Sequence, residues 1–379
     1  MPLLILGASA RAAAQSAVRA GLAPITIDLF ADRDLAAIAT THRIDPGSYP
    51  NGLEEIVARI PGDDPWIYTG ALENAPDLID RVAALRPLWG ISGASLRAVR
   101  DPLAVAEALA SRGLPAPRSR VSDDGLPRDG SWLVKPLASA GGRGIRPLLG
   151  ENFRSGRSVY FQSRIEGTSL AALFVGSDGG STLLGVTRQL LGREGEPFAY
   201  LGSLGPWPLP RPVRESIAAI GQALVEAFRL RGVFGVDLIL DAQGRPLPVE
   251  VNPRYTASTE VLELASGRPL LLEHRRAFDS GVSGPTRSRI RPPAFVGKAV
   301  VYADRRCILP AIDAHRLRPD AARSFAVPPI CDLPAEGTVF EPGDPVLTVL
   351  SRGTTLESCS RRLHCRLARW RTRLSDADG

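Results

Sequence analysis

The sequence predicts an α/β unit at the N-terminus, a larger α+β unit in the middle and a small, mostly β segment at the C-terminus. Short apolar runs alternate with helical periodicities up to about residue 97. A proline-rich stretch at 114–117 separates this unit from a glycine-rich loop and a predicted strand pair. Late in the chain, short strand-like runs are separated by Pro and Gly. We therefore expect three parts, residues 1–97, 98–285 and 286–379.

The first residues predict a βαβ unit. An apolar run at 3–6 ends at Gly7, a helical apolar spacing follows over 13–18, and 25–28 is the next strand. The turn 7–11 lies where dinucleotide-binding folds carry a triple-glycine fingerprint, but only the first glycine is present. This favours a scaffold or substrate-side loop over a nicotinamide site.

Further helices and strands are predicted from the spacing of apolar residues and from the positions of Pro and Gly. Helices are expected at 76–86, 101–112 and 361–374, and strands at 299–303, 326–327 and 346–350. The last helix carries six arginines and an apolar face of Leu363, Leu367, Trp370 and Leu374. We expect it to dock on its own domain or on a second subunit, which leaves a homodimer open; a patch for anionic membranes or nucleic acid is the alternative.

Composition excludes several classes of protein. Hydrophobic residues make up 44% and charged residues 23%, which is ordinary for a globular protein. No apolar run approaches the ~18 residues of a membrane span. The net charge of +6 is spread along the chain, so no nucleic-acid or membrane partner is expected. The four cysteines form no C-x-x-C pair, which predicts free thiols and a cytoplasmic location.

A lysine followed by small residues is the first chemical signal. Lys135 ends a predicted strand, and the loop behind it contains Ser139, Gly141, Gly142 and Gly144. Glycines let backbone amides approach a phosphate chain, and the lysine supplies a point charge. The alternative is a glycine-rich hairpin with an exposed lysine. The chain has only two lysines, which argues against that alternative.

The second signal is a predicted hairpin over residues 235–254. Pairing Leu240 with Leu247 across the polar turn also pairs Asp237 with Glu250. Two opposed carboxylates repel each other unless a cation lies between them. An ordinary hairpin with its acids in solvent is the alternative, but apolar residues mark the other face as core.

Residues just beyond this pair extend the site. Asn252 follows Glu250 by the strand period of two and joins the same face. Oxygen ligands without His or Cys favour Mg²⁺ or Mn²⁺. Arg254 can contact a phosphate oxygen through its guanidinium.

Together, the lysine–glycine loop and the later motif D-x12-E-x-N-P-R resemble the ATP-grasp superfamily of ATP-dependent ligases, which activate a carboxylate as an acyl phosphate. The resemblance covers about residues 1–280. It implies a pre-ATP-grasp open α/β domain, then a two-lobed ATP-grasp fold with a linker helix, a lid over about 118–168 and a catalytic lobe. The C-terminal part resembles the small appended domains of some members. The implied cofactors are ATP and Mg²⁺ or Mn²⁺.

The resemblance also implies roles for single residues. Lys135 would contact the α- and β-phosphates, and the loop from Ser139 to Gly144 would close over the nucleotide. Gln162 and Ile165 would contact adenine. Asp237, Glu250 and Asn252 would hold Mg²⁺ at the β- and γ-phosphates. Arg254 would stabilise the transferred phosphoryl group.

Three positions depart from the pattern of the superfamily. Pro102 follows Asp101 where many members have a lysine, and Arg100 is the substitute that the sequence offers. Gln162 and Ser169 stand where an acid is common in the hinge and at the ribose. These departures bear on nucleotide affinity and on the preference for ATP.

Within the superfamily, residues 252–259 are similar to the group containing the tyramine–glutamate ligase of methanofuran biosynthesis. This implies a coenzyme-building ligase of one-carbon metabolism that joins an amino acid to an amine. Arg188, Tyr200 and Tyr255 are candidates for the substrate side, with simple packing as the alternative for each.

The expected activity is therefore that of an ADP-forming carboxylate–amine ligase, with a small carboxylate and an amine as substrates and a C–N bond as product. Two alternatives stay open. One is an ATP-dependent carboxylase that activates bicarbonate, and the other is an ATP-grasp scaffold that senses nucleotide without turnover.

Overall fold

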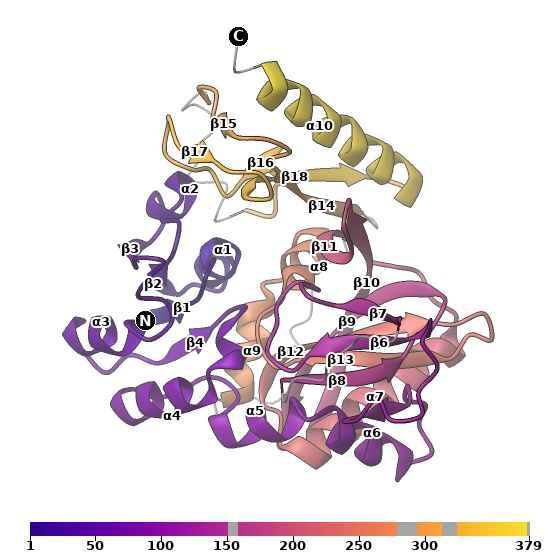
Figure 1. Ribbon diagram of the computed structural model, residues 1–379. Coiled ribbons are helices and arrows are strands. Elements are labelled where there is room, and N and C mark those ends of the chain that lie inside the picture. The colour runs from indigo at the N-terminus through magenta and orange to yellow at the C-terminus, as the bar shows by residue number, and fades with distance from the viewer. Residues whose placement is uncertain (151–157, 279–293, 313–323, 377–379) are drawn as a thin grey trace.

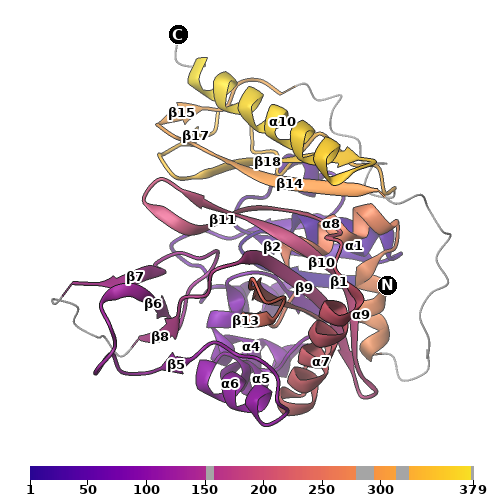
Figure 2. The ribbon, with the colours of Figure 1, turned by 90° about the vertical axis from the view of Figure 1, so that its right-hand side faces the viewer.

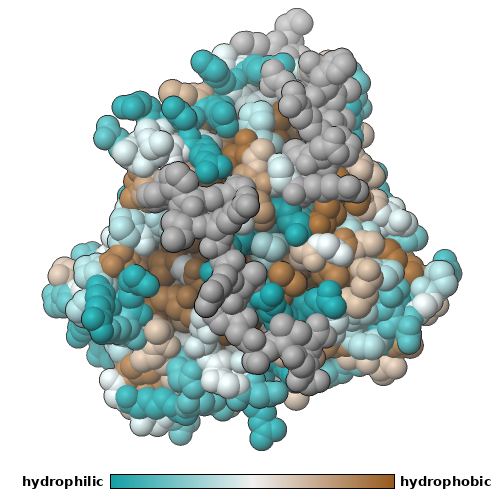
Figure 3. All heavy atoms as spheres, turned by 180° about the vertical axis from the view of Figure 1, so that it is seen from behind, coloured by the Kyte–Doolittle hydropathy of each residue, from teal (hydrophilic) through white to brown (hydrophobic). Residues whose placement is uncertain are grey.

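The structure is a computed structural model that describes residues 1–150, 158–278, 294–312 and 324–376. Figure 1 shows three regions: the N-terminal segment, a central region that contains most of the strands, and the C-terminal segment above them. In the described residues, no helix is long and apolar enough to cross a membrane. From behind, hydrophilic side chains surround apolar ones on a mixed surface (Figure 3).

The N-terminal segment contains a four-stranded sheet in the order β3-β2-β1-β4, and all of its pairings are parallel. The apolar run predicted at 3–6 is the fully buried centre of β1, as expected for a parallel strand covered on both faces. Its elements are β1 Pro2–Leu6, α1 Arg11–Arg19, β2 Ala23–Asp28, α2 Arg33–Ala36, β3 Thr40–Arg43, α3 Leu53–Arg59, β4 Trp66–Tyr68, the 3-10 turn Leu72–Asn74 and α4 Pro76–Leu85.

Two short helices lead from this sheet to a second sheet. They are α5 Gly93–Val99 and α6 Pro102–Ala110, and the Asp101 side chain caps the latter as the sequence predicted. The segment expected to form the lid contains a four-stranded sheet in the order β5-β8-β6-β7 around a small apolar core. Its strands are β5 Ser119–Arg120, β6 Asp129–Pro136, β7 Arg146–Leu149 and β8 Val159–Ser163.

The largest element is an eight-stranded sheet in the order β13-β12-β9-β10-β11-β14-β18-β16. Its first five strands are β9 Thr168–Ser177, β10 Gly180–Arg193, β11 Glu196–Gly205, β12 Gly232–Leu240 and β13 Pro246–Asn252. The helices of this region are α7 Arg211–Phe228, α8 Ala257–Ser266 and α9 Leu270–Phe278. The aromatic rings of Phe174 and Phe234 stack on neighbouring strands in the core.

The C-terminal segment adds strands to this same sheet. They are β14 Phe295–Tyr302, β16 Ile330–Cys331 and β18 Pro345–Gly353, and a separate pair joins β15 Cys307–Ile308 to β17 Val339–Phe340. The β14 strand pairs with β11, so the last part of the chain continues the central sheet without a break.

The tail helix α10, Leu356–Asp376, packs across β14 and β18 (Figure 2). Leu363, Trp370 and Leu374 are buried there, so the amphipathic helix docks on its own domain, one of the two outcomes expected. All four cysteines are free, as predicted.

The predicted fold class is confirmed, including the small β region at the C-terminus. The strand expected at 326–327 is wrong. The nearby strand is Ile330–Cys331, whose side chains are buried, whereas Ala326 is exposed and Val327 is half-buried. The boundary expected at 285 and 286 lies outside the described residues.

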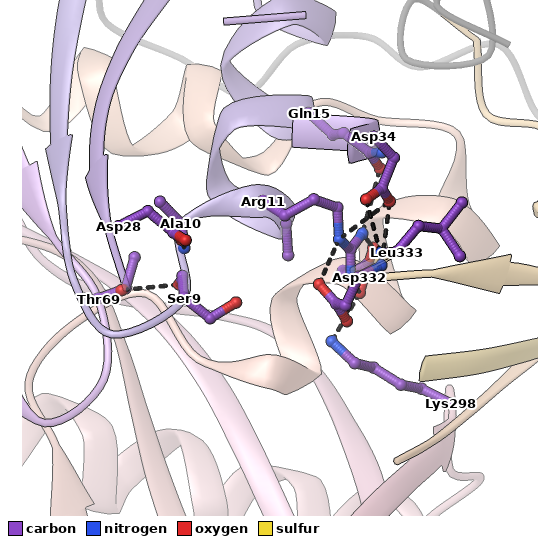
Figure 4. A network of polar contacts seen from close by, with 12 residues as sticks. Ser9, Ala10, Arg11, Gln15, Asp28, Asp34, Thr69, Lys298, Asp332 and Leu333 are labelled. Carbon is purple, nitrogen blue, oxygen red and sulfur yellow. Dashed lines mark hydrogen bonds and ion pairs between the residues drawn. The ribbon is translucent and has the colours of Figure 1, made fainter. Parts of the chain in front are cut away.

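A buried network of charges joins the three regions. Arg11 on α1 donates to both carboxylate oxygens of Glu260 on α8, and its Nε donates to Asp332 at 2.7 Å. Lys298 on β14 donates to the same Glu260 at 2.7 Å. Asp34 on α2 accepts from the backbone amide of Asp332 at 3.0 Å (Figure 4). Two carboxylates, Glu260 and Asp332, therefore balance the two buried cations Arg11 and Lys298, which lie far apart in the chain.

Replacing Glu260 tests the network. We expect Glu260→Gln to lower the free energy of unfolding by at least about 3 kcal/mol, because it leaves Arg11 and Lys298 buried with too little opposing charge. Urea denaturation of the variant and wild type measures this. The control is Glu55→Gln in an exposed pair with Arg59, for which less than about 1 kcal/mol is expected. Equal effects of the two variants would contradict the role of the network.

Candidate active site

The hairpin β12–β13 places Asp237 opposite Glu250, as the sequence predicted. Beyond this pair the register shifts by one, so Leu240 pairs with Pro246 and the expected pairing with Leu247 is wrong. The bulge leaves Val249 without a partner. Pro246 and Pro248 have no amide hydrogen to give to a regular ladder, which explains why the strand bulges here.

The bulge gives Lys135 a partner. The backbone carbonyl of Val249 accepts a hydrogen bond from Lys135 Nζ at 2.8 Å, and Gln162 Oε1 on β8 accepts another at 3.1 Å. Lys135 is buried at the end of β6. Lys135 of β6, Gln162 of β8 and the strand with the carboxylates therefore meet at one place.

The two carboxylates carry an electrostatic cost. Burial and the charge of Glu250 raise the pKa of Asp237 to about 7, although hydrogen bonds from the side chains of Gln189 and Asn252 act to lower it. In the described residues no three His, Cys, Asp or Glu side chains are grouped to hold a metal. Two carboxylates and an amide oxygen still fit Mg²⁺, which keeps several waters and shares its site with substrate phosphates.

Arg100 reaches this pair from the end of α5. Its Nη1 donates to Glu250 at 3.0 Å, and its Nη2 donates to Asn74 Oδ1 at 2.9 Å and to the carbonyl of Leu137 at 3.0 Å. The sequence offered Arg100 as the substitute for the missing lysine. Its position beside Glu250 and Lys135 supports that reading.

The glycine loop lies against the β10–β11 hairpin. The carbonyl of Gly141 accepts from the amide of Tyr200 at 3.0 Å, and Gly142 approaches the backbone of Phe198 so closely that an added Cβ would lie 1.9 Å from its carbonyl oxygen. The carbonyl of Ser139 accepts from Asn74 of the N-terminal region at 3.1 Å. The loop is therefore held from both sides.

Most predicted nucleotide residues line one cavity of about 510 Å³. Ser169 lines it too and donates to Gln189 at 2.7 Å. Ser139 lies instead beside a small neighbouring hollow with Arg100, and Gly144 is in neither. The predicted residues that the large cavity brings together are Lys135, Gly141, Gly142, Gln162, Ile165, Tyr200, Asp237, Glu250, Asn252 and Arg254.

A second cavity of about 460 Å³ adjoins the first and lies among all three regions. Tyr255 lines this one, and Gly141, Tyr200 and Arg254 line both. The turn 7–11 borders it through Ala8, Ser9 and Arg11, in keeping with a substrate-side loop. Arg188 lines neither cavity, because its guanidinium lies over the ring of Trp207 at 5.4 Å.

Arg254 stands at the junction of the cavities. Its Nη2 pairs with Glu73 at 2.7 Å and donates to Asn252 Oδ1 at 3.0 Å. Sequence reasoning missed Glu73, whose carboxylate is buried in the N-terminal region and has no recognisable motif around it. It also missed Gln189 as a neighbour of Asp237.

Comparison with known proteins identifies the central region. Residues 99–258 match the family model described as an ATP-grasp domain. The chain contains an ATP-grasp domain. ATP and Mg²⁺ are typical of this family, in agreement with the predicted cofactors, whereas the finer subgroup stays a prediction.

Two proteins are similar to this chain at low identity. An uncharacterised protein of Methanocaldococcus jannaschii is 25% identical over 230 residues, which cover 58% of this chain and 50% of that protein, so the match spans about half of the curated relative. An L-amino acid ligase from Bacillus licheniformis is 17% identical with a TM-score of 0.69, covering 100% of this chain and 98% of that one.

Carboxylating and carboxyamino-forming proteins are similar as well. The N5-carboxyaminoimidazole ribonucleotide synthetase of Thermus thermophilus is 19% identical with a TM-score of 0.69, covering 97% and 98% of the two chains. The biotin carboxylase domain of the Hydrogenobacter thermophilus 2-oxoglutarate carboxylase, in complex with MgADP and bicarbonate, is 14% identical with a TM-score of 0.70, covering 96% and 89%. These likenesses show the fold and leave the substrate open.

The glycine loop offers a matched test. We expect Gly142→Ala to weaken ATP binding by about 10-fold or more, because the new Cβ collides with the Phe198 carbonyl and pushes the loop away. Gly141→Ala is the control, since it has a similar positive φ but open space around an added Cβ. Titration with ATP and Mg²⁺ measures both. Equal losses would show that backbone strain alone, and not the close approach, matters.

The carboxylate pair offers a test by pH. With its pKa raised to about 7, folded Asp237 keeps a proton that the unfolded chain has lost, so wild-type stability falls as pH rises from about 4 to 7. We expect Asp237→Asn to raise the melting temperature in EDTA, and to do so more at pH 8 than at pH 5. The control is Asp241→Asn in the same hairpin. Because hydrogen bonds from Arg245 lower the pKa of Asp241, this variant should lower the melting temperature instead of raising it. A gain independent of pH would contradict the expectation.

Proposed function

We propose that this chain is a Mg²⁺- and ATP-dependent carboxylate–amine ligase that forms ADP. The observation that carries the proposal is the meeting of two cavities at Arg254. One cavity contains the lysine, the glycine loop and the two carboxylates that a Mg–nucleotide needs. The other is large enough for an organic substrate.

The nucleotide side follows from charge and hydrogen bonding. Lys135 and Arg100 place two cations beside the glycine loop, where a triphosphate is neutralised most effectively. Asp237, Glu250 and Asn252 would hold Mg²⁺, which neutralises charge on the phosphates when it is bound. When the nucleotide binds, Arg100 would pair with its phosphates instead of with Glu250. The carboxylate of Glu250 would then be free to bind the metal.

The chemistry would take place at the junction. A carboxylate oxygen of the substrate attacks the γ-phosphorus and ADP leaves, which yields an acyl phosphate. The amine nitrogen then attacks the acyl carbon, phosphate leaves, and the nitrogen loses a proton. Arg254, which pairs with Glu73, would stabilise the transferred phosphoryl group. The loop at Gly141 and Gly142 would exclude water from the acyl phosphate.

The shape of the second cavity favours an organic acceptor over bicarbonate alone. Its volume of about 460 Å³ is within the range of small-molecule sites, and many of its walls are apolar. An ATP-dependent carboxylase stays the alternative, because carboxylases are among the similar structures. The finer proposal of a coenzyme-building ligase that joins an amino acid to an amine rests on residues 252–259.

The experiment measures ADP release from Mg·ATP with pools of amino acids, amines, small acids and bicarbonate. We expect one pool of acid and amine to stimulate release, and Glu250→Gln to lower the stimulated rate at least ~100-fold because a metal ligand and the partner of Arg100 are lost. Glu215→Gln, in an exposed pair on α7, is the control and should keep the wild-type rate.

The other outcomes decide between the alternatives. Stimulation by bicarbonate without an amine would favour the carboxylase. ATP binding without turnover in any pool would favour the nucleotide-sensing scaffold. An active Glu250→Gln variant would contradict the placing of the metal.

A further inference from the structure

One side of the tail helix α10 carries a row of arginines. Figure 2 shows this helix as the outer layer of the C-terminal region. Its buried residues include Leu363, Trp370 and Leu374, which turn one side of the helix toward β14 and β18. Residues spaced by four, seven and eleven positions share a side of a helix, because one turn takes ~3.6 residues. The arginine row, which has this spacing beside the buried side, consists of Arg362, Arg366, Arg369 and Arg373.

The arginine row has no carboxylate partners. Arg362 donates to the backbone carbonyl of Arg352 at 2.9 Å. Arg366 donates to the backbone carbonyl of Leu350. Within the described ranges of the chain, no ion pair joins the row to Asp or Glu. A carbonyl accepts a hydrogen bond but does not neutralise a charge, so the row keeps its full positive charge.

The charges of the row repel one another. Burial and the charges of Arg362 and Arg369 lower the pKa of Arg366, which agrees with the three guanidinium groups lying close together. Exposed arginines elsewhere pair with acids one turn away, as Arg211 on α7 does with Glu215 at 2.6 Å. An anionic partner would supply the opposing charge that the chain itself does not give to the row.

The exposed side of α10 offers charge without large apolar surface. Its exposed residues are arginines and small or polar side chains, whereas its large apolar side chains are buried or half-buried. A membrane-bound helix places its apolar side in lipid, and a stable protein interface has an apolar centre rich in aromatic residues. A nucleic-acid backbone requires neither, because cationic side chains bind its phosphates and the planar fork of arginine matches phosphate oxygens. The row therefore fits a nucleic acid better than a membrane or a protein.

We propose that the arginine row of α10 binds the phosphate backbone of a nucleic-acid duplex without reading its sequence. From Arg362 to Arg373 the helix rises ~16 Å, over which one strand of a duplex presents about five phosphates. No Phe, Tyr or Trp of α10 is exposed for bases to stack on, which favours a duplex over a single strand. The spread of charge along the sequence predicted no such partner, but folding leaves this row as a local concentration of positive charge.

The row lies away from the second cavity. Val300 on β14 lines that cavity, whereas its neighbours Ala299 and Val301 belong to one apolar cluster with Leu363 and Trp370 of α10. Neighbouring residues of a strand point to opposite faces of the sheet, so α10 covers the face away from the cavity. A duplex bound on α10 therefore leaves the cavity open, and the inference does not depend on the proposed function.

The test measures binding of the full chain to labelled duplexes of ~20 base pairs by fluorescence anisotropy, between ~50 and ~200 mM salt. Two DNA duplexes of different sequence and one RNA duplex are the probes, and binding of either kind of duplex supports the inference. At ~50 mM salt we expect a dissociation constant of ~10⁻⁴ M or below, equal within ~2-fold for the two DNA sequences. The logarithm of the association constant should fall with the logarithm of salt concentration with a slope of about −3 to −4, because four arginines displace about four counterions.

Two double variants locate the site. Arg369→Gln with Arg373→Gln should weaken binding ~10-fold or more at low salt and bring the slope about 2 closer to zero. The matched control is Arg59→Gln with Arg211→Gln, which removes two exposed arginines from α3 and α7 and should leave binding unchanged within ~2-fold. Both double variants lose the same charge, so the comparison separates the row from general attraction. A melting temperature close to that of the wild type shows that each variant folds.

Several results would overturn the inference. They are no binding of any duplex at ~50 mM salt, equal losses in the two double variants, or more than ~10-fold discrimination between the two DNA sequences. Tighter binding of phosphatidylserine vesicles or of a poly-glutamate peptide, lost in the Arg369→Gln and Arg373→Gln variant, would assign the row to a membrane or to an acidic protein instead. ADP release is measured separately, so its absence would remove the ligase and leave this inference standing.

Discussion

The pairing of buried charges around Glu260 is the interaction on which the arrangement of this molecule depends. Arg11 comes from the start of the chain and Lys298 from the last part, and both are buried against one carboxylate of the central region. Buried charges are tolerated only when groups of opposite charge and hydrogen bonds compensate them. The network therefore favours one relative arrangement of the three regions. The second cavity lies at that meeting point, and its shape depends on the same pairing.

A similar dependence links the two cavities. Arg254 belongs to the ATP-grasp domain, but the carboxylate that orients it, Glu73, belongs to the N-terminal region. Arg100 and Asn74 likewise connect the first region to Glu250 and to the loop at Ser139. The residues nearest the expected phosphoryl transfer are therefore positioned by contacts between regions. A nucleotide that binds Arg100 would change those contacts.

Much of the fold could be predicted from the sequence because its helices and strands have strong local sequence patterns. The buried strand 3–6, the capped helix that begins at Pro102 and the amphipathic tail helix each follow from periodicity and caps. The failures have physical causes. The short apolar pair at 326–327 has no periodicity to separate strand from loop. The register beyond Asp237 shifted because two prolines interrupt the ladder.

The sequence by itself determined the chemistry of one hairpin and one loop. Asp237, Glu250 and Asn252 share a face because the strand period is two and the turn between them is short, and Lys135 precedes its glycines in the same stretch of chain. Only the tertiary structure decided which distant groups join them. Glu73 contacts Arg254, Arg100 contacts Glu250, and Arg188 stacks on Trp207 away from both cavities. Contacts between residues so far apart in the chain follow no local period, and they form only when the three regions pack together.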